Sequence, residues 1–201
     1  MNITEINSVF ERLKRLSSRL DKKDGEGYQW SYTFPDGVET TYILKNIKNF
    51  EEIEDDISNL FIWVWNLKDY LKKLAEVNGR NPQEVEDIIN SDNNLQICAD
   101  IANVLKHGSL RKSRSHLYPK LSRLRFEIPH TALSSLTYRG KEIELNIAKT
   151  QEVLLSKPVL DKNENEIGDG LKILSDGLKR FENYFKKITK TSQQKNRGDW
   201  E

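Results

Sequence analysis

Two stretches of this chain carry apolar residues at alternating intervals of four and three, the spacing that places them along one side of a helix. In the first stretch, from about Phe50 to Val77, these residues are Ile53, Ile57, Leu60, Val64, Leu67, Leu71 and Leu74. In the second, from about Gly168 to Ile188, they are Ile167, Leu171, Leu174, Leu178, Phe181, Phe185 and Ile188. The spacing predicts two long helices, each with a seam that packs on another helix, either within one chain or between the two copies of a homodimer.

Three further helices are predicted from the same periodicity. Residues 4–20 carry apolar residues at helical spacing. A short helix follows Asn81, a residue type that favours the cap position before a helix. The third helix begins at Ser91 or Asp92 and ends at Gly108, since glycine is common just after a helix.

Alternation of apolar and polar residues with a period of two predicts strands between these helices. It runs through residues 28–44, where the turn signal at residues 35–37 predicts a β-hairpin. It returns at about residues 122–160, where Pro158 indicates that the last strand lies at a sheet edge.

The predicted fold class is α+β and mainly α: a helical bundle with long heptad-patterned helices plus a small antiparallel β-sheet or hairpin. A chain of 201 residues fits one compact domain. We expect residues 1–188 to form that single domain and residues 189–201 to form a flexible polar tail.

The composition limits where the chain works and what it binds. Cys98 is the one cysteine in the sequence, so no disulfide forms within the chain. The longest apolar run, Leu60 to Trp65, is far shorter than a membrane span, and the amino-terminal stretch has no apolar signal-peptide region. We therefore expect a cytoplasmic protein with no membrane partner. The net charge is only +1, so any attraction to nucleic acid must come from local clustering.

A polar stripe runs along the helix that ends at Gly108. At about 100° per residue, Asp100, Asn103 and His107 fall beside the apolar face of this helix, and Lys106 lies further toward solvent. At such a border a carboxylate can orient an amide or an imidazole, which makes these residues catalytic candidates. A structural alternative stays open, because Lys106 and His107 also complement the negative end of the helix dipole and the stripe can be a satisfied hydrogen-bond network.

The segment from Ile101 to Phe126 contains no acidic residue. Its cations are candidate nucleic-acid-binding residues: Lys106, Arg111, Lys112, Arg114, Lys120, Arg123 and Arg125. Tyr118 and Phe126 lie among them and could stack on bases. This local excess of positive charge favours RNA or another anionic partner. The alternative is a solvated loop that pairs with the acidic residues at 51–56.

Three stretches stand out by their motifs: "DIANVLKH" (100–107), the aromatic "FIWVWNLKDYL" (61–71) and "EIGDGLKILSDGLKRFENYF" (166–185). Together they resemble a group of small uncharacterised bacterial and phage proteins. Members of that group pair an aromatic helix and an Asn/Asp-x-x-Lys-His helix end with several strands and a final helix. The resemblance covers most of the chain and implies no particular activity.

In "RKSRSH", four residues separate Arg111 from His116. With the helical pattern and the Lys-His helix end, this spacing is similar to the motif of the HEPN superfamily, helical domains that cut or bind RNA in toxin–antitoxin and defence systems, often as dimers. The resemblance implies metal-independent endoribonuclease chemistry. His116 would then be the general acid or base at the ribose 2′-hydroxyl, Arg111 would stabilise charge on the phosphate, and Asn103 would position the substrate.

Two functions from different classes follow from these patterns. The first is that of a small bacterial or phage protein of defence, toxin–antitoxin or mobile-element type, which binds RNA or cuts it without a metal. The alternative is a non-catalytic protein–protein interaction or inhibitor module that uses the helical seams and the aromatic hairpin. The sequence contains no glycine-rich phosphate loop, dinucleotide fingerprint or metal-ligand spacing, so we expect neither a metal nor a cofactor.

Overall fold

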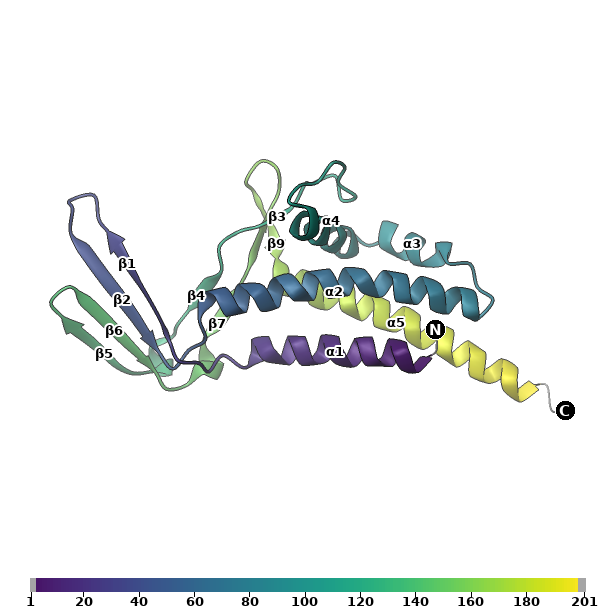
Figure 1. Cartoon of the computed structure of the whole chain (residues 1–201), viewed down its shortest axis with the longest axis horizontal. Helices are drawn as coiled ribbons and strands as arrows, with labels where there is room; N and C mark the ends of the chain where they lie inside the picture. Colours follow the sequence, from purple (N-terminus) through teal and green to yellow (C-terminus); the bar gives the residue numbers. More distant parts are fainter. Residues whose placement is uncertain (1–2, 199–201) are drawn as a thin grey trace. The chain divides into compact units, whose positions relative to one another are not determined.

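The computed structural model describes the backbone of residues 3–198 and the side chains of residues 4–189 (Figure 1). The described chain divides into two compact units. Unit 1 contains residues 3–15, 58–122 and 157–198, and unit 2 contains residues 16–57 and 123–156. Two compact units can belong to one domain or to two, so the single domain expected over residues 1–188 stays a prediction.

Helices dominate unit 1. It contains the first part of α1 (Ile3–Asp21), most of α2 (Phe50–Val77), α3 (Gln83–Asn90), α4 (Asn93–His107) and α5 (Gly170–Gly198). The apolar seam of α2 is buried as its spacing predicts, at Leu60, Val64, Leu67, Leu71 and Leu74. These side chains belong to a core that also includes Ile6 and Leu13 of α1, Val85 and Ile89 of α3, Leu95 and Ile101 of α4, and Leu174 and Phe181 of α5.

Helices α4 and α5 pack closely because Gly177 leaves no side chain between them. A Cβ atom at this position would lie 3.2 Å from a methyl carbon of Leu95 and 3.4 Å from the sulfur of Cys98. At the start of α4, the carboxylate of Asp92 accepts a hydrogen bond from the backbone N–H of Leu95 at 3.0 Å. At its end, Gly108 adopts a φ of +75° and donates its N–H to Val104. Both ends of α4 are therefore capped, as predicted.

Unit 1 also contains a three-stranded sheet in the order β3 (Lys120–Leu121), β8 (Pro158–Leu160) and β9 (Glu166–Asp169), with all pairs antiparallel. The prediction that Pro158 marks a sheet edge is wrong. It is the first residue of the central strand, where its carbonyl accepts a hydrogen bond from the N–H of Ser122 at 2.8 Å. A strand's first residue is a position that proline tolerates.

The main sheet of unit 2 joins two β-hairpins that are far apart in the sequence. Strands β1 (Tyr28–Thr33) and β2 (Glu39–Lys45) pair antiparallel, as do β5 (Leu133–Arg139) and β6 (Glu142–Ile147). Strand β2 also pairs with β6, in parallel, so the order is β1-β2-β6-β5. A separate ribbon is formed by β4 (Arg125–Glu127) and β7 (Leu154–Ser156).

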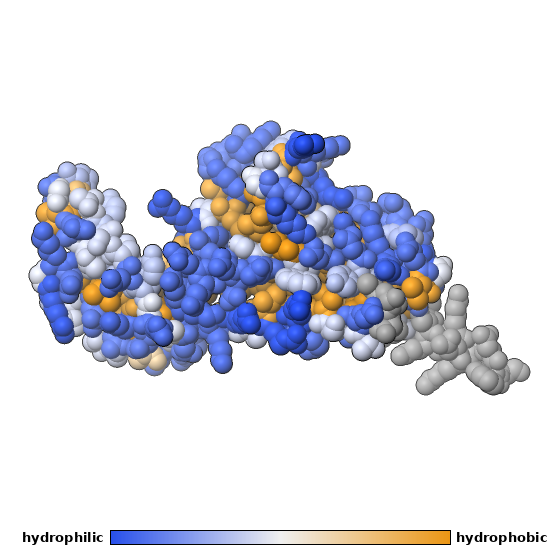
Figure 2. All heavy atoms as spheres, in the orientation of Figure 1, coloured by the Kyte–Doolittle hydropathy of each residue, from blue (hydrophilic) through white to orange (hydrophobic). Residues whose placement is uncertain are grey.

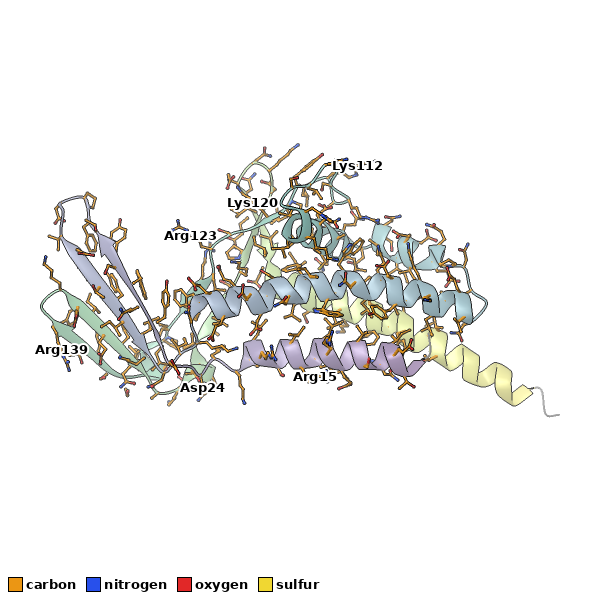
Figure 3. All side chains as sticks on the ribbon, in the orientation of Figure 1. Arg15, Asp24, Lys112, Lys120, Arg123 and Arg139 are labelled. Atoms are coloured by element: carbon orange, nitrogen blue, oxygen red, sulfur yellow. The ribbon has the colours of Figure 1, made fainter. Side chains whose placement is uncertain are left out.

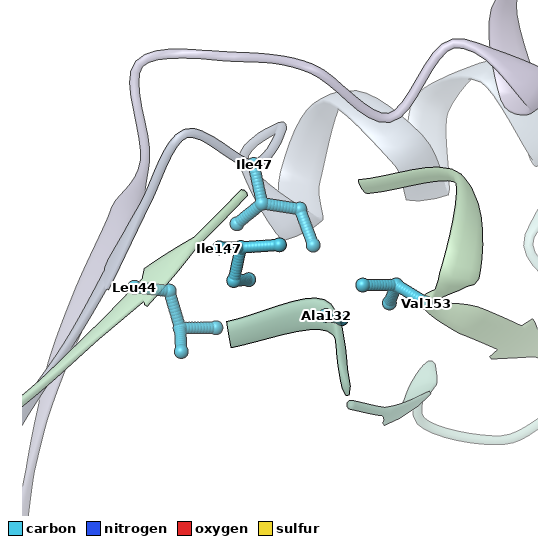
Figure 4. Close-up of a cluster of buried hydrophobic side chains, with 5 residues drawn as sticks. All are labelled: Leu44, Ile47, Ala132, Ile147 and Val153. Carbon is cyan, nitrogen blue, oxygen red and sulfur yellow. The ribbon is translucent and has the colours of Figure 1, made fainter. Parts of the chain in front are cut away.

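One face of this sheet is apolar across all four strands. Its two rows follow from the pairing register: Trp30, Tyr42, Ile143 and Tyr138 in one, and Tyr28, Leu44, Leu145 and Leu136 in the other. At the end of the sheet lies a cluster of buried side chains, shown in Figure 4: Leu44, Ile47, Ala132, Ile147 and Val153. Two short 3-10 helices, His130–Ala132 and Thr150–Glu152, each contribute or adjoin a residue of this cluster.

The predicted fold class, a helical bundle with a small antiparallel sheet or hairpin, is wrong. Among the described residues, five helices hold 51% of the chain, and nine strands in three sheets hold 22%, so the fold is mixed α and β. The expectation failed because the periodicity of a strand does not specify its partner. The parallel pairing of β2 with β6 joins residues about 100 positions apart, such as Leu44 and Leu145.

The predicted tail at residues 189–201 falls partly within α5, which continues to Gly198 rather than ending near Ile188. Residues 199–201 lie outside the described part of the chain. On the face of the molecule seen in Figure 2, most of the surface is hydrophilic and hydrophobic residues are exposed in separate patches. This surface agrees with a chain in which 31% of residues are charged.

Candidate anion-binding site

Asp100 of α4 is fully buried, and its carboxylate holds the loop that follows the helix. Its Oδ2 atom accepts hydrogen bonds from the Ser113 hydroxyl at 2.6 Å, the Ser115 hydroxyl at 2.7 Å and the Ser115 N–H at 3.0 Å. Its Oδ1 atom accepts the N–H of Arg114 at 2.8 Å. Four donors therefore surround a carboxylate that has no contact with solvent, which makes Asp100 an anchor for the loop rather than a residue that meets a ligand.

The two serine hydroxyls also organise the loop beyond them. Ser113 accepts the N–H of Tyr118 at 3.2 Å, and Ser115 accepts the N–H of Leu117 at 3.3 Å. His116 and Tyr118 adopt left-handed backbone conformations, with φ of +62° and +51°. The basic segment after Gly108 is thus a shaped loop held to α4, and the side chains of His116 and Tyr118 are exposed on it.

Arg114 points back onto the helices of unit 1. Its guanidinium donates to Glu86 of α3 at 2.7 Å and lies 5.1 Å from the ring centroid of Trp65 on α2. Lys72 forms a second ion pair with Glu86. Burial alone would raise the pKa of Glu86, but the hydrogen bonds from Lys72 and Arg114 outweigh it and hold the pKa below its ordinary value.

Two other cations of the basic segment have partners as well. The ammonium of Lys106 donates to Oδ1 of Asn66 on α2 at 2.5 Å, and Lys120 pairs with Glu164. Their charges are partly exposed, so these contacts position the side chains without removing them from the surface. Glu86 and Glu164, the partners of Arg114 and Lys120, lie outside the stretch at 51–56 that the sequence suggested.

A surface pocket of about 520 Å³ lies where α4 ends and this loop begins, and we call it the anion pocket. Its lining residues are Asn103, His107, Ser109, Leu110, Arg111 and Lys112. No carboxylate is among them. Figure 3 shows Lys112 on the loop, and the structure gives neither Arg111 nor Lys112 an ion pair or hydrogen bond within residues 4–189. Two cations, an amide and an imidazole around one hollow suit a phosphate group.

The structure brings together some of the predicted site residues and separates others. Asn103, His107, Arg111 and Lys112 share the anion pocket. Asp100 is buried beneath the loop, and His116 is exposed but does not line the pocket with Arg111. The remaining two cations of the basic run, Arg123 and Arg125, belong to unit 2.

Sequence reasoning missed the serines. Ser113 and Ser115 alternate along the basic segment, and that spacing lets both hydroxyls reach one acceptor. The polarity of "KSRSH" gave no sign that the acceptor is Asp100, because the two segments meet only through the turn after Gly108. The lining residues Ser109 and Leu110 had no pattern that could have indicated their role.

Among the described residues, no group of three or more His, Cys, Asp or Glu side chains is arranged to hold a metal ion. No helix in that part of the chain combines the length and apolarity needed to cross a membrane. Comparisons with protein-family models, curated proteins and solved structures find no match to this chain.

Proposed function

We propose that this protein is a cytoplasmic RNA-binding protein that holds the RNA backbone in the anion pocket. The observation that carries the proposal is that Arg111 and Lys112, which the structure leaves without acidic partners, line one pocket with Asn103 and His107 and with no carboxylate. The surrounding segment, residues 101–126, has no acidic residue in a chain whose net charge is +1. The resemblance to HEPN domains favours RNA as the anion and a role in defence or toxin–antitoxin systems.

The loop is suited to this task because its shape does not depend on the ligand. The hydrogen bonds from Ser113, Arg114 and Ser115 to Asp100 fix the backbone just after Lys112. A ligand that binds Arg111 and Lys112 therefore meets a loop that is already ordered, which lowers the entropic cost of binding. The side chains that meet the phosphate remain long and adaptable.

The test is the salt dependence of RNA binding. We expect the wild-type protein to bind a fluorescein-labelled single-stranded RNA octamer, with a Kd that rises steeply between 50 and 200 mM salt. Removing both phosphate contacts in Arg111→Gln/Lys112→Gln should weaken binding and reduce the slope of log K against log salt by about 1.4. Lys172→Gln/Lys179→Gln on α5, where both lysines are also exposed, is the matched control for the loss of two charges.

Failure of the wild-type protein to retain RNA at 50 mM salt contradicts the proposal, as does an unchanged slope in the double variant. The same samples show whether the RNA is cut, since a metal-independent nuclease remains active in EDTA. His107 lines the anion pocket beside Arg111, so cleavage by this site should disappear in His107→Ala. Cleavage that disappears only in His116→Ala would favour the Arg111–His116 pair.

A second candidate function, that of a protein–protein interaction module, is favoured by the sheet of unit 2. The apolar face of that sheet opens into a groove of about 470 Å³. Leu136 and Tyr138 on its rim are 49% and 69% exposed. Exposed apolar grooves of this kind often bind other proteins. If this function is right, the His107→Ala and His116→Ala variants should still bind the protein partner, and the Leu136→Ser/Tyr138→Ser variant should not.

A further inference from the structure

A second pocket of unit 1, of about 430 Å³, lies between α1 and α2 and differs in chemistry from the anion pocket. Its lining residues are Glu5, Ser8, Val9, Arg12, Arg15, Trp63 and Tyr70. Two aromatic rings and two guanidinium groups provide flat surfaces, and Glu5 and Ser8 add hydrogen-bonding groups. We call it the aromatic pocket.

The flat surfaces of the aromatic pocket are already arranged for stacking. The guanidinium of Arg12 lies 4.4 Å from the centroid of the Trp63 ring. Trp63 and Tyr70 are seven residues apart on α2, which places them on the same side of the helix and about 10 Å apart along its axis. Aromatic rings and arginine planes are the surfaces on which proteins stack unpaired bases.

A side-chain contact between α2 and α4 connects the aromatic pocket with the anion pocket. Asn66 and Tyr70 follow Trp63 at positions i+3 and i+7, so the three side chains lie along one side of α2. The side chain of Asn66 accepts the hydrogen bond from Lys106 of α4, and His107, the next residue, lines the anion pocket. All of these residues belong to unit 1, so contacts within one compact unit connect the two pockets.

We propose that the aromatic pocket binds a base of the same single-stranded RNA whose backbone the anion pocket holds, an inference that rests on the proposed function. The carboxylate of Glu5 argues for a base rather than a second phosphate in this pocket. It repels a phosphate but accepts hydrogen bonds from the exocyclic amino group of adenine, cytosine or guanine. The indole, the guanidinium and the phenol then stack on or beside the ring of the base.

The experiment compares a single-stranded adenosine octamer with an octamer of abasic nucleotides, which keeps the phosphates and lacks the bases. We expect wild-type protein to bind the abasic octamer at least about fivefold more weakly, the lower end of what one stacked base contributes. Trp63→Leu should weaken binding of the adenosine octamer by a similar factor and change binding of the abasic octamer less than twofold. Trp63→Phe, which keeps an aromatic ring, should retain most of the wild-type affinity.

The two ligands separate failure of this inference from failure of the proposed function. If wild-type protein binds neither octamer, both are wrong. If it binds both octamers equally tightly, the phosphate site stands and the base site is overturned. Equal weakening of both octamers by a folded Trp63→Leu variant also overturns the inference, because the loss of affinity then does not depend on the bases. Arg12→Gln and Tyr70→Leu provide the same comparison if Trp63→Leu does not fold.

Discussion

At the scale of single residues, Asp100 shows how a motif that suggests catalysis can instead organise a binding loop. Its position beside the apolar face of α4 agrees with the helical wheel, and its burial is complete. The donors that satisfy it all come from residues 113–115. Of the two interpretations left open for the polar stripe, the hydrogen-bond network describes Asp100, while Asn103 and His107 line the anion pocket.

We expect Asp100→Asn to lower the free energy of unfolding by about 2–4 kcal/mol. Both carboxylate oxygens accept hydrogen bonds, so the amide nitrogen of asparagine must face a donor that is left unsatisfied in a buried site. Urea denaturation followed by circular dichroism measures the change. Asp176→Asn on the exposed side of α5 removes the same charge and should shift the midpoint little. An equal shift in both variants would contradict the anchoring role of Asp100.

Tyr184 of α5 makes the free energy of unfolding depend on pH in the alkaline range. Burial, together with the nearby carboxylate of Glu84, raises the pKa of Tyr184 to about 12. In the unfolded chain the phenol titrates near 10. The contribution of Tyr184 to the free energy of unfolding is therefore fully present below pH 10. It is lost as pH rises toward 12, because the unfolded chain releases the phenol proton at a lower pH than the folded chain.

We expect the stability difference between wild-type protein and Tyr184→Phe to fall by roughly 1 kcal/mol between pH 9 and pH 11. Phenylalanine cannot ionise, so the variant lacks this part of the alkaline destabilisation and serves as the reference for all other titrating groups. Urea unfolding at fixed pH values measures both proteins. A difference that stays constant over this range would show that the phenol titrates alike in the folded and unfolded states.

At the scale of elements, the main sheet depends on close approach of the backbone just before β1. Gly27 has a φ of +111°, and its N–H donates to the carbonyl of Ile47 at 2.9 Å. A Cβ atom here would lie 2.3 Å from the carbonyl oxygen of Leu44 on β2. Only glycine fits this position without moving β1 away from β2.

Gly27→Ala should therefore cost about 3 kcal/mol of stability in unit 2, from the clash and the left-handed backbone together. Gly140→Ala, in the turn between β5 and β6, is the matched control. Its φ is +63°, but no atom within 4 Å meets the added Cβ, so the expected cost is only about 1 kcal/mol. Amide hydrogen exchange of β1 and β2 measures both effects, and similar protection in the two variants would rule out the predicted clash.

Elements were predictable to the extent that local sequence determines them. The seam of α2 and the caps of α4 follow from side-chain spacing and from the residue types at the helix ends, and both are found. The parallel pairing of β2 with β6 and the central place of β8 are not properties of a local stretch. Each depends on which distant strand offers a complementary edge, and a period of two is the same whichever partner the strand finds.

In the whole molecule, the described chain has two compact units, and each contains a different part of α1 and of α2. Asp100 belongs to unit 1 and Gly27 to unit 2, and they share no hydrogen-bond partner. Substitutions at independent sites usually add. The division into units thus predicts that the stability costs of substitutions in the two units add, which a double variant can check.

We expect the costs of Asp100→Asn and Gly27→Ala to add to within about 0.5 kcal/mol in the double variant. The measurement is amide hydrogen exchange in both units, because two units need not unfold in one transition. Asp100→Asn should speed exchange in α4 and Gly27→Ala in β1 and β2. Faster exchange of both regions in each single variant would show that the units unfold as one, and a coupling of more than about 1 kcal/mol would show that the two sites interact.

The helices, the alternation of the strands and the local excess of positive charge between residues 101 and 126 can be predicted from the sequence alone, because each is a property of neighbouring residues. The tertiary structure decided what those residues do. It buried Asp100 beneath the loop, tied Arg114 to Glu86, and left Arg111 and Lys112 in an open pocket with Asn103 and His107. The reason is physical: a charged side chain is buried or left for a ligand according to the partners that folding brings to it, and those partners come from other parts of the chain.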